Sequence, residues 1–326
     1  MGWRTVGVVA AAVVVATTAA TPAVADTLEW TVSALPMPPG LAGASGYLEA
    51  HDGHGGYVAS VHAPQGNAIV TWRNGEPTAH DLPTGQDSVL VLGESRDDTI
   101  LLSTPDHLLL TLDDSGYHQL PTPPSTFADW GVIGPDGDIV ITAMAADGST
   151  SVQHSTVAQP GWWQPVAGVT PRSTAIAIDN DGSVLMSGPN GSYVLRGRLG
   201  RHLSAPAGPA AHPPSGSRIT NGVVVGTGYP TARGYTQALE WTAPGRAPLV
   251  LNGGAAATDV NANGVVVGVA TASTPVVWSQ GVDATDLPLP AGRDAGVPAG
   301  VDDDGTVVGN VWTQDDGITY PVVWRH

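Results

Sequence analysis

The sequence predicts an all-β protein, a seven-bladed β-propeller of four-stranded blades that is closed by N- and C-terminal strands sharing one blade. Three observations predict it: a turn-and-strand signal that occurs seven times, a very high turn content, and incomplete repeats at the two ends. The chain contains 42 Gly and 28 Pro, yet 42% of its residues are hydrophobic. This composition favours a turn-rich globular protein over a disordered one.

Residues 1–25 have the pattern of a secretory signal peptide. Arg4 precedes an apolar stretch at residues 6–20, and Ala23-Val24-Ala25 forms a small-residue cleavage site before Asp26. A membrane anchor is the alternative, but about fifteen apolar residues are fewer than the roughly twenty that span a bilayer. We therefore predict a secreted, extracellular protein without membrane insertion, in which residues 26–326 form a single propeller domain.

A short turn followed by β-branched residues recurs along the whole chain at intervals of 39 to 45 residues. Asn-Gly and Asp-Gly between two β-rich runs favour the primed hairpin turns, because both residues tolerate positive φ angles. Each signal therefore predicts a hairpin between the first two strands of a repeat. The turns lie at residues 54–55, 97–98, 136–137, 181–182, 221–222, 263–264 and 304–305.

Two further strands follow each hairpin. The third run often ends in Trp, and the fourth ends in a Leu-Pro or Pro-Gly corner. Four strands in about forty residues is the size of one propeller blade. The four tryptophans share a register within their blades, so we expect them to pack between neighbouring sheets. They are Trp72, Trp241, Trp278 and Trp324.

The two ends of the chain complete one blade. The seventh repeat stops after its third strand at His326, and residues 31–36 have the pattern of an isolated fourth strand. Pairing them closes the ring and removes free sheet edges. Glu29-Trp30 also resembles the third-strand pair Glu240-Trp241, so an eight-bladed ring or an open stack of sheets is an alternative.

The last three repeats resemble the HAF repeat of bacterial extracellular proteins. Residues 259–268 read DVNANGVVVG and residues 301–309 read VDDDGTVVG, close to the Asn-x-x-Gly-x-Val-Val-Gly core of that repeat. The resemblance covers residues 217–326 and weakens toward the N-terminus. It implies a secreted, propeller-like array and assigns no chemistry.

Composition disfavours several classes of function. The formal net charge is −17 and every cation is an Arg, so nucleic acid is an unfavourable partner. The absence of Lys excludes Schiff-base and P-loop chemistry, and the absence of Cys excludes disulfides and thiolate metal sites. No G-x-S-x-G motif and no S-x-D-x-G-x-x-W sialidase box is present.

Three polar stretches resemble fragments of metal sites. Residues 179–182 and 302–305 resemble parts of a calcium loop, and His51 and His54, with His62 further on, resemble part of a zinc site. Each stretch lacks further ligands and falls on or beside a predicted turn. We therefore interpret the acidic stretches as structural and residues 51–54 as a solvated turn, and we predict no metal and no cofactor.

The candidate binding residues lie in loops that join the second and third strands of a blade. These loops are predicted to share one face with the connections between blades. Exposed aromatic and polar side chains together are typical of sugar or peptide recognition, although ordinary loop variation explains them about as well. The residues are His62, Gln65, Asn67, Tyr229, Arg233, Tyr235, Trp312 and Asp315.

We expect a non-catalytic recognition module, not an enzyme. It would be lectin-like or protein-binding through one face of the ring, and its partner would be a cell-surface glycan or another exported protein. One alternative is a polysaccharide hydrolase or lyase, which needs two carboxylates, or a His and a carboxylate, near the axis. Only five Glu residues are present and most Asp residues fall in turns, which weighs against it. A structural envelope component is the second alternative.

Overall fold

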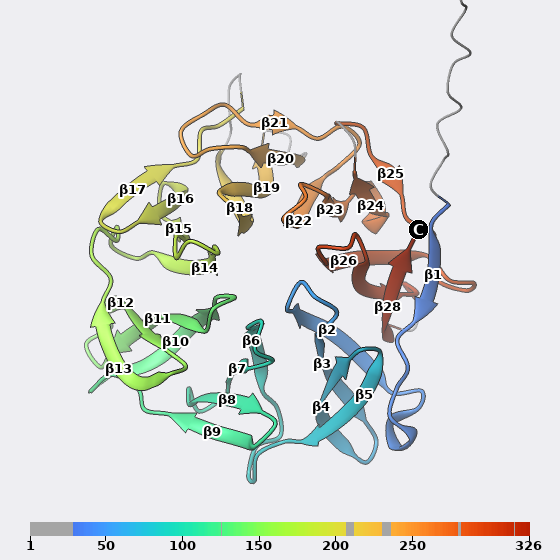
Figure 1. Cartoon of the computed structure of the whole chain (residues 1–326), viewed down its shortest axis with the longest axis horizontal. Coiled ribbons are helices and arrows are strands. Elements are labelled where there is room, and N and C mark those ends of the chain that lie inside the picture. Colours follow the sequence, from blue (N-terminus) through green and yellow to red (C-terminus); the bar gives the residue numbers. More distant parts are fainter. Residues whose placement is uncertain (1–28, 125, 207–211, 230–235, 280–281, 316) are drawn as a thin grey trace, which may run out of the picture.

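The computed structural model is a seven-bladed β-propeller, as predicted (Figure 1). It describes residues 29–124, 126–206, 212–229, 236–279, 282–315 and 317–326. The predicted signal peptide lies outside these described residues. Within them, no helix is long and apolar enough to cross a membrane.

Each blade is an antiparallel sheet of four strands, and in blades 1 to 6 these strands follow one another in sequence from the axis outward. Blade 1 consists of β2 (Ser45–His51), β3 (Tyr57–Ala63), β4 (Gly66–Arg73) and β5 (Glu76–Asp81). Blade 2 consists of β6 (Leu90–Glu94), β7 (Ile100–Ser103), β8 (Leu109–Asp113) and β9 (Gly116–Leu120). Blade 3 consists of β10 (Thr126–Ile133), β11 (Asp138–Ala145), β12 (Thr150–Thr156) and β13 (Gln159–Pro165). Blade 4 consists of β14 (Thr174–Ile178), β15 (Val184–Gly188), β16 (Gly191–Arg196) and β17 (Leu199–His202). Blade 5 consists of β18 (His212–Thr220), β19 (Val223–Tyr229), β20 (Gln237–Trp241) and β21 (Leu249–Val250). Blade 6 consists of β22 (Ala256–Val260), β23 (Val266–Val269), β24 (Pro275–Trp278) and β25 (Thr285–Asp286). Blade 7 consists of β26 (Ala295–Val301), β27 (Val307–Trp312), β28 (Thr319–Arg325) and β1 (Thr31–Ala34), and two short 3-10 helices are η1 (Pro39–Leu41) and η2 (Thr271–Ser273).

Blade 7 joins the two ends of the chain. β1 pairs antiparallel with β28, from Thr31 opposite Arg325 to Ala34 opposite Val322, and Figure 1 shows these strands side by side. The predicted closure is therefore correct, and the ring has seven blades rather than eight. Sharing one sheet ties the N-terminal strand to the last repeat and leaves no unpaired seam.

The core is divided among the interfaces between successive blades. The tryptophans of the third strands pack in these interfaces as predicted, and none is more than 2% exposed. Each indole Nε1 donates a hydrogen bond to a carbonyl at the outer end of the preceding blade. The pairs are Trp72 with Pro36 (2.6 Å), Trp241 with Ser204 (2.8 Å), Trp278 with Asn252 (3.1 Å) and Trp324 with Pro288 (2.7 Å).

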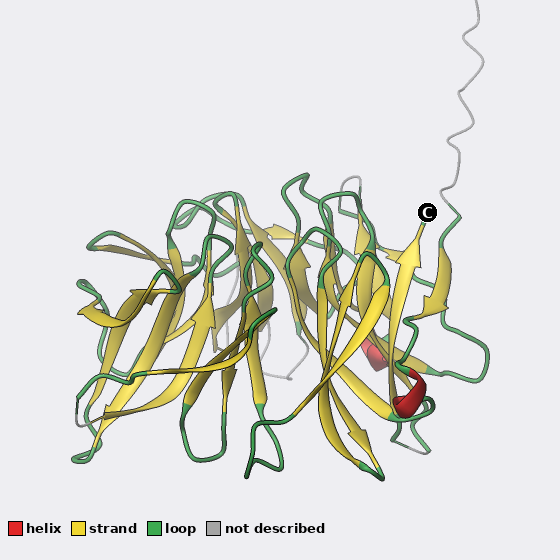
Figure 2. Ribbon diagram, turned by 60° about the horizontal axis from the view of Figure 1, so that its bottom comes forward, coloured by secondary structure: helices red, strands yellow, loops and turns green. Residues whose placement is uncertain are grey.

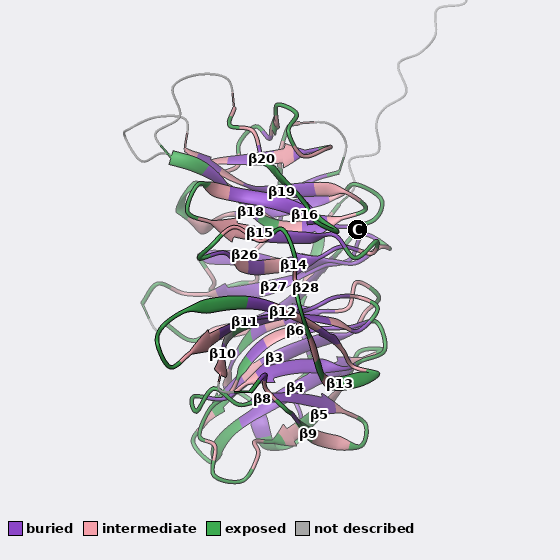
Figure 3. Ribbon diagram, turned by 90° about the vertical axis from the view of Figure 1, so that its left-hand side faces the viewer, coloured by how far each residue is buried: buried purple, intermediate pink, exposed green. Residues whose placement is uncertain are grey.

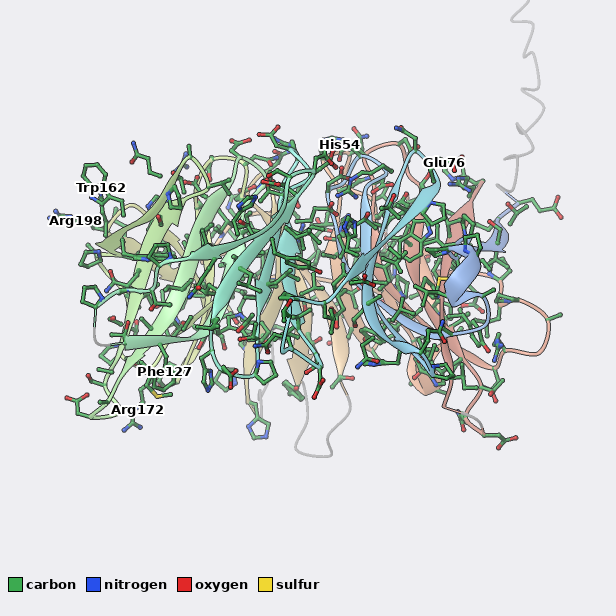
Figure 4. The ribbon with its side chains drawn as sticks, turned by 90° about the horizontal axis from the view of Figure 1, so that it is seen from below. His54, Glu76, Phe127, Trp162, Arg172 and Arg198 are labelled. Carbon is green, nitrogen blue, oxygen red and sulfur yellow. The ribbon has the colours of Figure 1, made fainter. Side chains whose placement is uncertain are left out.

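The ring has two distinct faces, because successive strands run in opposite directions between them (Figure 2). We call the face with the first and third hairpins of each blade the turn face; it carries His54 and Glu76 (Figure 4). The opposite face, with the second hairpins and the connections between blades, is the linker face; it carries Phe127 and Arg172. Figure 3 shows that buried residues are concentrated in the strands and exposed ones in the loops of both faces.

The predicted primed turn occurs at the first hairpin of blade 5 alone among the seven. Asn221 and Gly222 there both have positive φ, 51° and 79°. In blades 2, 3, 4, 6 and 7 only the second residue of the turn signal has a positive φ angle. An example is Gly182 (φ 75°), whose N–H donates to the Asp179 carbonyl at 3.0 Å. A three-residue hairpin loop also favours Gly, because its last residue has a positive φ angle. An Asp-Gly pair in the sequence therefore does not distinguish this three-residue loop from the two-residue primed turn.

Candidate functional site

The predicted binding residues of blade 1 lie on the linker face, and two of them hold neighbouring loops in place. Gln65 donates its side-chain amide to the Gly40 carbonyl, and Asn67 Nδ2 donates to the Asp87 carbonyl at 2.7 Å. His62 Nδ1 lies 3.0 Å from Asn67 Oδ1. Gln65 and Asn67 therefore join the second hairpin of blade 1 to the connections before and after it.

The other predicted residues come from blades 5 and 7. Tyr229 packs edge-on against His212 with ring centroids 5.6 Å apart, Trp312 is half-buried at the end of β27, and Asp315 is exposed. Arg233 and Tyr235 lie outside the described residues. Among the predicted residues that are described, no hydrogen bond, ion pair or ring contact joins side chains of different blades. The topology thus places them on one face as separate groups.

Three apolar side chains that the sequence analysis missed are exposed on innermost strands. Tyr47, Leu90 and Trp130 are 48%, 43% and 39% exposed. They belong to β2, β6 and β10, the innermost strands of three successive blades. We call these three residues the apolar patch; Tyr47 and Leu90 lie in the half of their strands that begins at the linker face.

Trp130 is exposed because of a displaced β-bulge. Every innermost strand contains a β-bulge before its first hairpin, and β18 of blade 5 contains a second register shift nearer its start. In blades 1, 2, 4, 6 and 7 the extra residue of the bulge lies two residues before the end of the strand. In blade 3 it lies two residues earlier, between Ala128 and Trp130. Since a shift in a strand exchanges the faces of its side chains, Trp130 is exposed where the equivalent Leu48 and Val91 are 1% and 7% exposed.

The bulges also line a cavity of about 170 Å³ on the axis, which we call the central channel. A bulge re-aims the extra side chain away from the regular alternation, and here it faces the axis. The bulge residues that line the channel are Glu49, Leu92, Ile176, Ser217, Thr258 and Ala299.

A buried His joins three blades beside this channel. His51 Nε2 lies 3.0 Å from Asp259 Oδ2 on blade 6, and His51 Nδ1 lies 3.7 Å from Asp302 Oδ1 on blade 7. Tyr57 donates its hydroxyl to Asp302 Oδ2 at 2.6 Å. We call His51, Asp259 and Asp302 the blade clasp; they are 8%, 2% and 2% exposed.

Gly300 has no side chain, and this makes room for the His51 ring. A Cβ atom at position 300 would lie 2.2 Å from the His51 ring, closer than any real contact. The interpretation of residues 51–54 as a solvated turn is therefore wrong for His51 and correct for His54, whose side chain is 46% exposed. The reason is that His51 is the last residue of β2, just beyond the bulge, and packs against the neighbouring blade.

The acidic turns connect neighbouring blades. The Asp179 carboxylate accepts the backbone N–H groups of Asn221 and Gly222 on the next blade, both at 2.7 Å. Asp303 Oδ1 accepts the backbone N–H of Ala262 at 2.9 Å. These bonds support the structural interpretation of both stretches. In the part of the chain that the structure describes, no group of three or more acidic, His or Cys side chains is placed to hold a metal ion.

Burial and charge shift several pKa values around the channel. Burial opposes protonation of His51, but the charge of Asp259, its close contact with His51 Nε2, and the more distant Asp302 carboxylate outweigh it and raise the pKa to about 9. Burial also acts to raise the pKa of Asp259, but the His51 charge outweighs it and lowers that pKa. Burial raises the pKa of Glu94 to about 8, against the charge of Arg73, which donates to Glu94 Oε1. At neutral pH His51 is therefore cationic between two carboxylates.

We expect the stability of the protein to fall between pH 6.5 and about 9 as His51 loses its proton. Because the folded pKa exceeds the ordinary 6.5, the folded state binds more protons across this window, so the stabilisation is complete below it and absent above it. The raised pKa of Glu94 acts in the same direction up to about pH 8. Urea unfolding from pH 6 to 9.5 measures the trend; an equal slope in wild type and His51→Ala would refute it.

Comparison with known proteins shows similarity at the level of the fold. No protein-family model and no curated protein sequence matches the chain. A catalytically inactive variant of virginiamycin B lyase from Staphylococcus aureus, solved with quinupristin, superposes with a TM-score of 0.57 at 16% identity over 91% of this chain and 100% of that one. The WD40 β-propeller domain of Doa1 gives 0.52 at 11% identity over 87% and 94% of the two chains. YCF48 bound to D1 peptide gives 0.52 at 9% identity over 91% and 96%.

Proposed function

We propose that this protein is a secreted, non-catalytic recognition propeller that binds an extracellular partner through its linker face. The observation that carries the proposal is the apolar patch. Tyr47 and Leu90 expose large apolar side chains in the linker-face half of β2 and β6, and Trp130 does so near the middle of β10, so the three lie on the innermost strands of successive blades. Large exposed apolar side chains mark binding sites where they gather on one surface. Aromatic side chains also contribute most to binding at protein interfaces.

The scaffold suits recognition because its loops stand on a rigid ring. Seven inter-blade cores and the clasp hold the innermost strands, so little ordering entropy is lost when a partner binds. YCF48, which has the same fold, is known with a bound peptide. An exported protein that presents an extended segment is therefore the first partner we propose, and a surface glycan is the second.

An enzyme is the second candidate, and one observation favours it. His51, Glu94 and Asp259 do meet near the axis, and the pKa values of Glu94 and Asp259 are shifted in opposite directions, as in many acid–base pairs. We place recognition first because none of these side chains is more than 8% exposed, and His51 and Asp259 are occupied in the clasp. Polysaccharide cleavage that Glu94→Gln abolishes would reverse this order.

A pull-down from secreted proteins, combined with a glycan array, tests the proposal. We expect a Tyr47→Ala, Trp130→Ala double variant to lose a specific partner, with binding at least about 30-fold weaker, since the loss of even one interface hot spot costs about 2 kcal/mol or more. Isothermal titration with the captured partner measures the loss.

The matched control is Trp162→Ala. Trp162 is 64% exposed, more than Trp130, but projects from the outer strand β13 at the rim of the ring (Figure 4). Its loss should leave binding unchanged. If both variants weaken binding equally, or if the double variant binds like wild type, the linker face is not the recognition surface. Absence of any partner would favour a structural role.

A further inference from the structure

The polar part of the central channel contains more carboxyl groups than cations. Glu49, Glu94 and Asp259 line the channel together with His51 and Arg218. Asp52 and Asp98 act on Glu94 from nearby, and Arg73 binds both Glu94 and Asp98 from outside the channel. In a chain of net charge −17, the surrounding potential also favours a cationic guest.

Two buried oxygen atoms in this part have no hydrogen-bond partner among the described residues. They are Glu94 Oε2 and Asp259 Oδ1, and the two residues are 5% and 2% exposed. Arg218 Nε lies 3.3 Å from Asp259 Oδ1 without forming a hydrogen bond. A buried carboxyl oxygen without a hydrogen bond is costly. Within the described part of the chain, Asp259 Oδ1 has the Arg218 ion pair alone and Glu94 Oε2 has no donor at all, so a guest that donates a hydrogen bond would satisfy both atoms.

The channel also has an apolar part. Blades 2 to 4 contribute Leu92, Val132, Ile133 and Ile176 to it. A guest that satisfies both parts therefore has a hydrogen-bonding cation at one end and a short alkyl chain at the other. A metal ion would use three or more protein ligands, a group that the described residues do not form.

We propose that the central channel binds an alkylammonium or alkylguanidinium group, with its cation between Glu94 and Asp259 and its alkyl chain against Leu92 and Ile176. The same chemistry is offered by a free small amine and by a Lys or Arg side chain of a partner protein. The site does not involve the apolar patch, so it stands or falls independently of the proposed linker-face recognition.

Isothermal titration of the full chain with n-butylguanidinium tests the proposal, with n-butanol as the neutral control. We expect saturable binding of the cation and none of the alcohol. Glu94→Gln should weaken binding by about 10- to 100-fold, as loss of a charged hydrogen bond does. Ile176→Trp fills the apolar part without changing a charge and should abolish binding, whereas Trp162→Ala at the rim should not alter it.

A second titration distinguishes the two sources of the cation. A capped tripeptide with one central Arg should compete with n-butylguanidinium if a partner side chain can reach the channel; binding of the free cation alone identifies a small amine. No saturable binding of either probe, or binding that survives both Glu94→Gln and Ile176→Trp, would overturn the proposal.

Binding should also release a proton. Glu94 must be ionised to hold the cation. Burial, together with the charges of its neighbours Asp52 and Asp98, raises its pKa and keeps it protonated at neutral pH against the charges of Arg73 and His51. Affinity for n-butylguanidinium should therefore rise by up to about tenfold per pH unit between pH 6 and 8. Glu94→Gln should remove this dependence, and a wild-type affinity that does not change with pH would count against the site.

Discussion

Replacing His51 by Ala should lower the free energy of unfolding by about 3 to 5 kcal/mol, the cost of removing one partner from a buried ion pair. The variant would leave Asp259 and Asp302 buried without the cation that lies between them. Because these residues belong to blades 1, 6 and 7, the loss affects the part of the ring where the two ends of the chain meet. Urea unfolding at pH 7 measures the change.

His54→Ala is the matched control for this variant. His54 lies three residues further on, its side chain is 46% exposed, and its nearest charged partner, Asp303, is 3.9 Å away. Its removal should change stability by less than about 0.5 kcal/mol, as is usual for exposed positions. If His51→Ala proved as stable as His54→Ala, the clasp would not contribute to the stability of the ring.

Replacing Trp324 by Ala should cost about 3 to 5 kcal/mol, the range for removing a buried Trp from a core. Trp324 is fully buried between blades 6 and 7, and its Nε1 donates to the Pro288 carbonyl at 2.7 Å. It lies on β28, opposite Val32 of β1, so the cavity would form beside the strand pair that closes the ring. Thermal and urea unfolding measure the loss.

Two variants separate the contributions of Trp324. Trp324→Phe retains most of the apolar contact and loses the hydrogen bond. It should lower the free energy of unfolding by about 1 to 3 kcal/mol, because the Pro288 carbonyl is left unpaired and the ring is smaller. Trp162→Ala removes an equally large but 64% exposed side chain and should have little effect. Equal losses in Trp324→Ala and Trp162→Ala would show that burial between blades is not the source of stability.

The architecture could be predicted from the sequence because its signals are local and repeated. A Gly-containing turn next to β-branched residues, such as Asn263-Gly264 before Val265, specifies a hairpin within a few residues. Seven such signals determine the number of blades, and the incomplete repeat ending at His326 indicates where residues 31–36 must pair. The Trp positions follow from the same register.

The candidate sites could not be predicted in this way. A bulge is one extra residue in an otherwise regular strand, and nothing in residues 126–133 marks its displacement in blade 3. It nevertheless decides that Trp130 is exposed. The turn signals likewise gave no means of separating His51 from His54, since both adjoin the same hairpin.

The sequence by itself thus determined the propeller, its seven blades and the shared seventh blade, because hairpin turns and strand alternation depend on neighbouring residues. Only the tertiary structure decided the apolar patch, the central channel and the blade clasp. Their members, such as His51 and Asp259, are some two hundred residues apart in the chain, and ring closure alone brings them within 3.0 Å. Contacts of that kind depend on how complete blades pack around an axis, which no local pattern records.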